Sequence, residues 1–231
     1  MSSFFAKLIN STKFVVESFK IYKMQIRTFY KILFLVSFIW LLAFASPKNF
    51  NFQKTNFDRY ILDSEKSKLH WNCVHHGYLK FKEGEILFDG KEPIQANFTV
   101  DMASIINTDI NNKLLQGTLQ NVLKSDVFFD VKNYPTARFE SDLIRKIDSI
   151  NYDIVGDFIL FESGICTDFE GTITIKNDSV YFNTKTITLD RTDWSIFYGS
   201  ANNPKPREEE EGFSITDTIL VDAHIVAYKI K

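Results

Sequence analysis

Alternation of apolar and polar residues runs through most of the chain beyond residue 57 and constrains its fold more than any other feature. In residues 94–101, Ile, Ala, Phe and Val alternate with Gln, Asn, Thr and Asp, which is typical of a strand with one buried face. The pattern recurs at residues 69–73, 154–160, 169–175, 180–189 and 219–228. Asp89 and Gly90 supply a hairpin turn signal. Repeated strands joined by turns predict an all-β domain built as one antiparallel sheet, sandwich or barrel.

Residues 109–124 interrupt the alternation. Their apolar side chains fall at helical spacing, at Leu115, Leu119, Val122 and Leu123. Asp109 is available to cap the first turn. Gly117 weakens such a helix by about 1 kcal/mol relative to alanine. The segment predicts a short helix, or two, inserted between strands.

The N-terminal segment reads as an export signal. Basic residues, among them Arg27 and Lys31, precede an apolar run at residues 32–45. The small residues Ala43 and Ala45 end this run in an A-x-A pattern. A basic region, a short apolar region and small residues are typical of a signal peptide. The run is shorter than the roughly 20 residues that span a bilayer.

These features divide the chain into four parts. We expect a mis-assigned start at residues 1–23, a signal peptide at 24–45, a flexible leader at 46–56 and one β domain at 57–231. Cleavage near Ala45 would accompany export of the domain. An uncleaved membrane anchor is the alternative.

The sequence shows few residues arranged for chemistry. The net charge of −2 gives no electrostatic footprint for nucleic acid. His75 and His76 are neighbours, which point to opposite faces of a strand and do not readily share a metal ion. Asp126 and Asp130 flank two phenylalanines in a segment that reads more simply as a turn than as a carboxylate pair. We therefore expect no catalytic residue, metal or cofactor, and no enzyme activity.

The two cysteines, Cys73 and Cys166, lie far apart in the sequence. In an oxidising compartment outside the cytoplasm, these two cysteines could form one disulfide. Two buried free thiols are the favoured interpretation.

Aromatic residues make up 15% of the chain, including 23 phenylalanines. A barrel of about eight strands is just wide enough to be filled by side chains or to hold one slender ligand. Phe, Trp and Leu would suit a hydrocarbon chain, because its burial recovers roughly 25 cal/mol per Å². The same residues would equally make a dry, solid core, and the pattern leaves both open.

Segments of the chain resemble, in order, the motifs of the YceI-like family. They are "FTVDMASIINTDI" (98–110), "VLKSDVFFDVKNYPTARFES" (122–141), "YDIVGDFILF" (152–161), "LDRTDWSIFYGS" (189–200) and "ITDTILVDAHIVA" (215–227). The resemblance covers residues 60–227. Val122 stands where the family motif has a histidine.

The resemblance implies a lipocalin-like antiparallel β-barrel of about eight strands, with the helical insertion around 109–124. Members of the family are usually periplasmic and bind polyisoprenoids or other amphiphilic lipids such as quinones. From the strand faces we expect ligand contacts at Trp71, Phe98, Phe128, Phe129, Tyr134, Phe139 and Phe158. Asp126 and Arg191 match family motif positions. They either fix turns or meet a polar head group, and we favour turns.

The leading hypothesis is therefore a periplasmic carrier for an isoprenoid, quinone-like or fatty lipid. Such a carrier would make transient membrane contact, and the oligomeric state, including a homodimer, stays open. The alternative is a filled barrel that acts through its surface as an interaction or stress-response protein. An enzyme that acts on a small apolar substrate is a third hypothesis.

Overall fold

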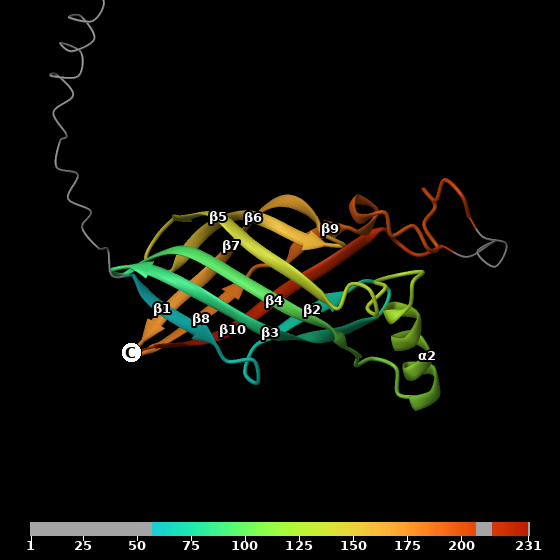
Figure 1. The fold of residues 1–231 in the computed structure, drawn as a ribbon, viewed down its shortest axis with the longest axis horizontal. Helices are drawn as coiled ribbons and strands as arrows, with labels where there is room; N and C mark the ends of the chain where they lie inside the picture. The colour runs from blue at the N-terminus through green and yellow to red at the C-terminus, as the bar shows by residue number, and fades with distance from the viewer. Residues whose placement is uncertain (1–56, 207–213, 231) are drawn as a thin grey trace, which may run out of the picture. The chain divides into compact units, whose positions relative to one another are not determined.

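The computed structural model describes residues 57–206 and 214–230, which form a barrel of antiparallel strands (Figure 1). The segments that we interpret as a start extension, a signal peptide and a leader lie outside the described residues. Within the described part of the chain, no helix is long and apolar enough to cross a membrane.

The elements follow one another in an order dominated by hairpins. They are β1 (Asp58–Leu62), β2 (Lys68–Asn72), β3 (His76–Asp89), β4 (Glu92–Asn107), α2 (Lys113–Lys124), β5 (Thr136–Lys146), β6 (Asn151–Leu160), β7 (Ser163–Lys176), β8 (Ser179–Thr184), β9 (Ile187–Asp190), the 3-10 helix η1 (Arg191–Trp194) and β10 (Thr218–Lys229).

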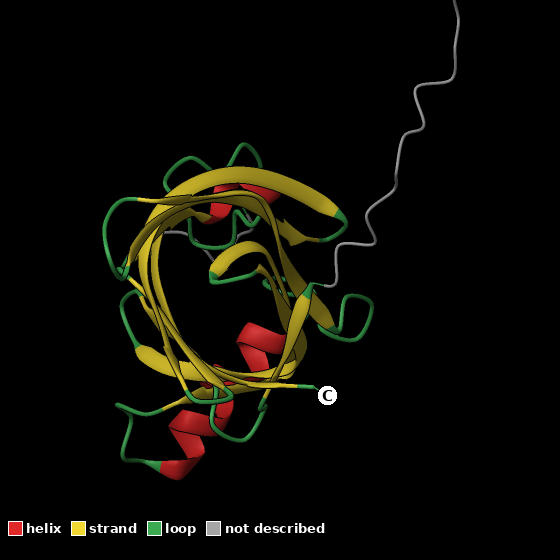
Figure 2. Ribbon diagram, turned by 90° about the vertical axis from the view of Figure 1, so that its left-hand side faces the viewer, coloured by secondary structure: helices red, strands yellow, loops and turns green. Residues whose placement is uncertain are grey.

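Eight strands close into a ring (Figure 2). The order around it is β10-β2-β3-β4-β5-β6-β7-β8, and β8 pairs with β10 to complete it. β1 pairs with the same two strands as β2, further along β10 and β3. β9 pairs with β10 beyond the end of β8. This architecture confirms the predicted all-β, lipocalin-like barrel.

The two ends of the barrel differ in their connections. One end has tight turns between β3 and β4 and between β7 and β8, which Gly90 and Asn177 make possible by adopting φ of 60° and 55°. In the β5–β6 turn, the side chain of Asp148 accepts hydrogen bonds from the backbone N–H groups of Ile150 and Asn151. The opposite end carries α2 and the longer connections, including the one from η1 to β10 (Figure 1).

The helix begins later than the sequence predicted. Its N-cap is Asn112, whose side-chain oxygen accepts hydrogen bonds from the backbone N–H groups of Leu114 and Leu115 at 3.0 and 3.2 Å. Asp109 was the wrong choice of cap. Its carboxylate is instead engaged by His75, in the bend between β2 and β3.

The half of the barrel near the tight turns is solidly packed, and we call it the filled half. Its side chains are almost completely buried, as at Ile86, Phe88, Ala96, Ile154, Val180, Phe182, Ile225 and Ala227. Phenylalanine rings pack in this half where a neighbouring strand supplies a glycine. A Cβ atom at Gly156 would lie 2.7 Å from the ring of Phe139, and one at Gly171 would lie 2.7 Å from Phe182. The glycines therefore leave the space that the rings occupy.

Candidate functional site

An apolar cavity of about 330 Å³ occupies the other half of the barrel, at the end that carries α2 and η1. We call this end the hollow half. Strands, the helix and loop residues all contribute to its wall. Aliphatic side chains predominate there, among them Leu79, Met102, Ile105, Leu123, Ile219 and Val221. Such a wall can hold an apolar chain, and the cavity volume is within the range of small-molecule sites.

Phenylalanine rings form the boundary between the two halves. Phe158 lines the cavity, and its ring centroid lies 5.0 Å from that of Phe139 and 6.0 Å from that of Phe169. Phe139 and Phe169 do not belong to the cavity wall. They pack behind Phe158, 5.4 Å from each other, so the cavity ends at this group of rings.

Five of the nine residues that we predicted to contact a ligand line the cavity. These are Trp71, Phe128, Phe129, Phe158 and Arg191. The structure does not bring the other four to its wall. Phe98 and Phe139 pack among other rings, Tyr134 packs against Phe161, and Asp126 is exposed in the turn after α2. Ligand contact by any of these residues stays a prediction.

The segment after α2 is a compact turn that directs its two phenylalanines to the cavity. The carbonyl oxygen of Ser125 accepts hydrogen bonds from the backbone N–H groups of Phe128 and Asp130. Asp130 adopts a φ of 42°. The rings of Phe128 and Phe129 meet edge to face at 4.8 Å, and both line the cavity. This confirms that the segment is a turn, and the rings that it presents make it part of the cavity wall.

Arg191 is the most completely buried charged residue that the structure describes, at 1% exposure. Its guanidinium donates hydrogen bonds to four backbone carbonyls, those of Ile196, Tyr198, Ile215 and Thr216. It also forms an ion pair with Asp217 at 3.0 Å and lies 5.6 Å from the ring centre of Phe128. Arg191 therefore ties the segment after η1 to the segment before β10, which is the turn-fixing role that we favoured.

A hydrogen-bonded histidine–aspartate pair lies at the rim of the cavity. His75 lines the cavity, and its Nδ1 atom lies 2.8 Å from Oδ2 of Asp109. The hydrogen bond from His75 and further bonds from the side chain of Asn107 and the backbone of His76 lower the pKa of Asp109 to about 2. The pair joins the β2–β3 bend to the segment that leads into α2.

Comparison with known proteins places the chain in a family. The family model described as the YceI-like domain matches residues 60–227. The chain belongs to this family. Curated protein sequences give no match.

Two solved structures resemble this YceI-like domain. The crystal structure of BcnA from Burkholderia cenocepacia is 20% identical, with a TM-score of 0.55, and the alignment covers 71% of this chain and 98% of that chain. A polyisoprenoid binding domain from Saccharophagus degradans, implicated in plant cell wall breakdown, is 14% identical, with a TM-score of 0.51 and coverage of 74% and 98%. At these identities the likeness establishes the fold.

Most of the aliphatic wall of the cavity in the YceI-like domain was not predicted from the sequence. Alternation in the sequence correctly put Ile219 and Val221 on one face of β10. The prediction of ligand contacts nevertheless selected aromatic residues. Met102 and Ile105 lie on the inner face of β4, beyond residues 94–101, whose alternation we used.

The cysteines of the YceI-like domain are free thiols. The expected burial was wrong for both. Cys73 is half-buried at the cavity wall, and Cys166 is exposed on β7. Cys166 alternates with Ile165 and Thr167 on the strand and lies on the outward face, which explains its exposure.

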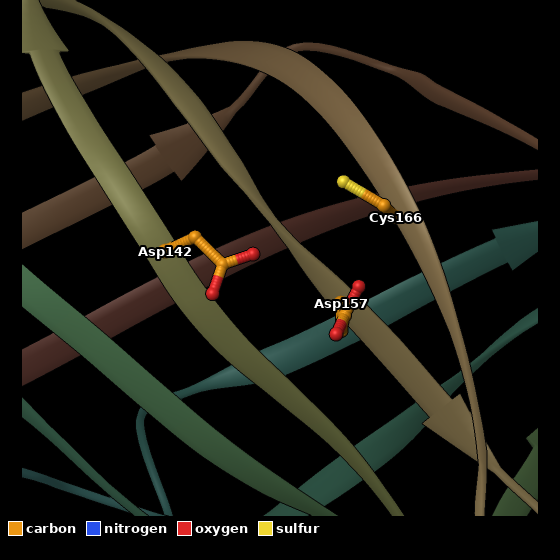
Figure 3. Close-up of side chains that lie close together, drawn as sticks. All are labelled: Asp142, Asp157 and Cys166. Carbon is orange, nitrogen blue, oxygen red and sulfur yellow. The ribbon is translucent and has the colours of Figure 1, made fainter.

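Cys166 also belongs to a group of side chains that contains metal-ligating atoms. Asp142 on β5, Asp157 on β6 and Cys166 on β7 face one another, with ligand atoms within 4.8 Å (Figure 3). Asp142 occupies a register shift between Ser141 and Leu143. Exposed acidic groups often gather without an ion, so we assign no metal site to this group.

Proposed function

We propose that this YceI-like domain is a periplasmic carrier that binds the apolar chain of an isoprenoid, quinone-like or fatty lipid in the cavity of the hollow half. The observation that carries the proposal is the cavity itself, about 330 Å³ with a predominantly apolar wall in a barrel whose other half is tightly packed. The likeness of the fold to the Saccharophagus degradans polyisoprenoid binding domain supports it.

Hydrophobic burial would drive this binding. Each methylene group that moves from water into an apolar site contributes about 0.8 kcal/mol. An apolar chain in the cavity would gain this contribution together with van der Waals contacts from side chains such as Met102 and Ile105. A saturated or prenyl chain therefore fits the site better than a small polar molecule.

The polar groups at the cavity favour binding over catalysis. The guanidinium of Arg191 is engaged by backbone carbonyls and by Asp217. The imidazole of His75 is paired with Asp109 at the rim. A catalytic centre needs polar groups that converge on a reacting atom, and these two groups serve the fold.

Delivery to the periplasm rests on the basic and apolar segments of residues 24–45. Fractionation of the native cells would test it, with recovery of a shortened chain in the periplasmic extract as the expected result. Recovery of the full-length chain with the membranes would instead favour the uncleaved anchor.

Organic extraction tests the carrier function. The protein is purified from its own periplasm and denatured in organic solvent, and the extract is analysed by mass spectrometry. We expect a lipid with an isoprenoid or fatty chain in stoichiometric amount. Met102→Trp, which places a larger side chain in the cavity, should lose the lipid. The matched control is Leu114→Trp, at an exposed position on α2, which should keep it.

An empty extract from the unmodified protein, confirmed after incubation with quinones and membrane lipids, would contradict the proposal. The barrel acting through its surface, as an interaction or stress-response protein, would then be the better account.

A further inference from the structure

The apolar side of α2 extends from the cavity wall to the outside of the barrel. Leu115, Leu119 and Leu123 are four residues apart and therefore share one face of the helix. Leu123 is buried, and it lines the cavity together with Leu119. Leu115 is 58% exposed, and its neighbour Leu114 is 78% exposed. The first turn of α2 thus presents two leucines to solvent, at the end of the barrel opposite the tight turns (Figure 1).

The β2–β3 bend adds a third exposed aliphatic side chain. Val74 lines the cavity and is also 64% exposed, so it lies at the mouth. Two contacts hold this bend beside the segment that leads into α2. The Nδ1 atom of His75 lies 2.8 Å from Oδ2 of Asp109, and the backbone N–H of Thr108 donates to the carbonyl oxygen of His76 at 3.0 Å. The bend and the segment before α2 are therefore fixed relative to each other.

The first turns of α2 are fixed to β4 as well. The side-chain nitrogen of Gln116 donates a hydrogen bond to the carbonyl oxygen of Asn107 at 2.6 Å. The exposed side chains of Val74, Leu114 and Leu115 are thus carried by connected segments, and we call these three residues the mouth patch. An apolar surface held beside the opening of an apolar cavity suits a partner from which the cavity could take its ligand.

The charge on α2 points to an anionic partner. Between Asp109 and Asp126 the chain contains no acidic residue, and its charged side chains are those of Lys113 and Lys124. Lys113 is next to the mouth patch, and its side chain is exposed. Each lysine near an anionic lipid surface adds to the attraction.

The composition of the mouth patch favours a bilayer over a protein. Specific protein interfaces bury about 800 Å² on each partner and depend on anchors such as Trp, Tyr and Arg. The mouth patch has three aliphatic side chains and none of these anchors. A bilayer needs no complementary shape, because aliphatic side chains enter the boundary between head groups and acyl chains one by one.

We propose that the mouth patch docks the domain on the surface of a bilayer that contains anionic lipid, so that the cavity opens towards the membrane. The inference rests on the proposed function and names the partner from which the carrier would load. Leu114, Leu115 and Val74 enter the bilayer surface, and Lys113 meets its anionic head groups. The tight-turn end of the barrel then faces away from the membrane.

Cosedimentation with vesicles of phosphatidylcholine and phosphatidylglycerol tests the docking. The protein purified from its own periplasm is compared with Leu114→Glu/Leu115→Glu. Both positions are in the first turn of α2, where acidic side chains favour a helix, so we expect the fold to be retained. The control is Ile147→Glu/Ile150→Glu, which makes the same charge change at two exposed positions in the β5–β6 turn.

We expect the bound fraction to correspond to at least about tenfold weaker vesicle binding in Leu114→Glu/Leu115→Glu and to stay near that of the unmodified protein in the control. Equal binding by the two double variants would overturn the inference. A loss confined to Ile147→Glu/Ile150→Glu would assign the membrane to the other end of the barrel and would overturn it too. A dimer without vesicles that only Leu114→Glu/Leu115→Glu dissociates would show that a second copy covers the patch instead.

Fluorescence quenching by brominated phosphatidylglycerol gives a second readout that needs no loss of binding. Leu114→Trp and Ile147→Trp each add one indole, and the unmodified protein supplies the background from its own tryptophans. We expect additional quenching in Leu114→Trp and none in Ile147→Trp, because only the first indole would enter the bilayer. Additional quenching of the same size in both variants would contradict docking through the mouth patch.

A titration without vesicles separates this inference from the proposed function. Leu114→Glu/Leu115→Glu leaves the cavity wall intact, so it should bind cis-parinaric acid, a fatty acid probe, as the unmodified protein does. If the probe binds and the two double variants sediment alike, the docking inference fails and the carrier function stands. If the unmodified protein does not bind the probe, the carrier function fails whatever the vesicles show.

Discussion

The same long strands build the filled and the hollow halves of the barrel, but the interiors of the two halves differ. β4 contributes Ala96 and Phe98 to the filled half and Met102 and Ile105 to the wall of the cavity. In the filled half, large rings meet glycines across the sheet, as Phe98 meets Gly84, and close the space. In the hollow half, aliphatic side chains line the wall and leave it open. A ring also packs against a glycine at the cavity wall, where a Cβ at Gly77 would lie 2.9 Å from Trp71. Rings and glycines therefore help to fill one half, but aromatic content alone does not decide whether the interior is solid.

The walls of the two halves differ as well. The register between β4 and β5 ends at the pair of Asp101 and Thr136. Further along β4, α2 and the turn that carries Phe128 take part in the wall. A helix and a turn follow the inner surface of a sheet less closely than a paired strand does. We infer that this change of wall is one physical reason for the cavity.

Phe182→Ala should produce the largest loss in the free energy of unfolding. A small loss would contradict the difference in packing between the two halves. Phe182 is 1% exposed in the filled half, so the truncation leaves a void among closely packed neighbours. We expect a loss of about 4 kcal/mol in the free energy of unfolding, measured in urea. Phe128→Ala, at the wall of the cavity, should cost about half as much because part of its surroundings is already empty. Equal losses would show that the hollow half is as densely packed as the filled half.

Gly156→Ala tests the pairing of ring and glycine. The added Cβ would lie 2.4 Å from the carbonyl oxygen of Glu140 and 2.7 Å from the ring of Phe139. We expect a loss of about 2 kcal/mol in the free energy of unfolding, because rings and backbone must shift. The control is Gly117→Ala in α2, where no atom lies within 4 Å of the new Cβ. It should stabilise the protein by about 0.5–1 kcal/mol. Destabilisation of similar size in both variants would contradict the account.

The hydrogen bond between His75 and Asp109 at the rim predicts a smaller, pH-dependent effect. The pKa of Asp109 is lowered to about 2, chiefly by its hydrogen bond with His75. A lowered pKa means that the ionised carboxylate stabilises the fold above the ordinary value of 3.8 and that this contribution is lost as the pH falls towards 2. Asp109→Asn should therefore cost about 1 kcal/mol at neutral pH. Urea unfolding of both proteins from pH 6 to pH 2 should show the difference disappear between about pH 4 and pH 2. A difference that does not change with pH would contradict this role.

The sequence predicts the strands well because inward and outward positions alternate on them. The inner face of β10 follows from this pattern, and the β3–β4 turn follows from the Asp89–Gly90 turn signal. Closure of the ring does not, because the pairing of β10 with both β2 and β8 joins residues far apart in the chain. The start of α2 was placed too early, since Asp109 and Asn112 are both good capping residues and only the contact with His75 distinguishes them.

The cavity wall was harder to predict than the fold. Alternation tells whether Phe98 or Phe158 points inwards, but not how deep along the barrel each ring lies. Whether a ring fills the core or lines the cavity depends on the glycine that lies across the sheet from it. It also depends on whether the ring lies on the cavity side of the phenylalanine cluster that contains Phe139. The indole nitrogen of Trp71 is buried and has no hydrogen-bond partner among the described residues. The sequence around Trp71 does not reveal this, because any acceptor would come from other strands and loops.

Filling the cavity tests the central claim most directly. The titration follows the fluorescence of cis-parinaric acid, a fatty acid probe, in the unmodified protein and in Met102→Trp. The control is Leu114→Trp, which adds the same ring at a position that is 78% exposed on α2. We predict saturable binding of one probe per chain in the unmodified protein and in Leu114→Trp. Met102→Trp, with its fold retained by circular dichroism, should bind at least about tenfold more weakly, because the new ring takes the space of the chain. Equal binding by all three proteins would contradict the claim that the hollow half is where this domain holds a lipid.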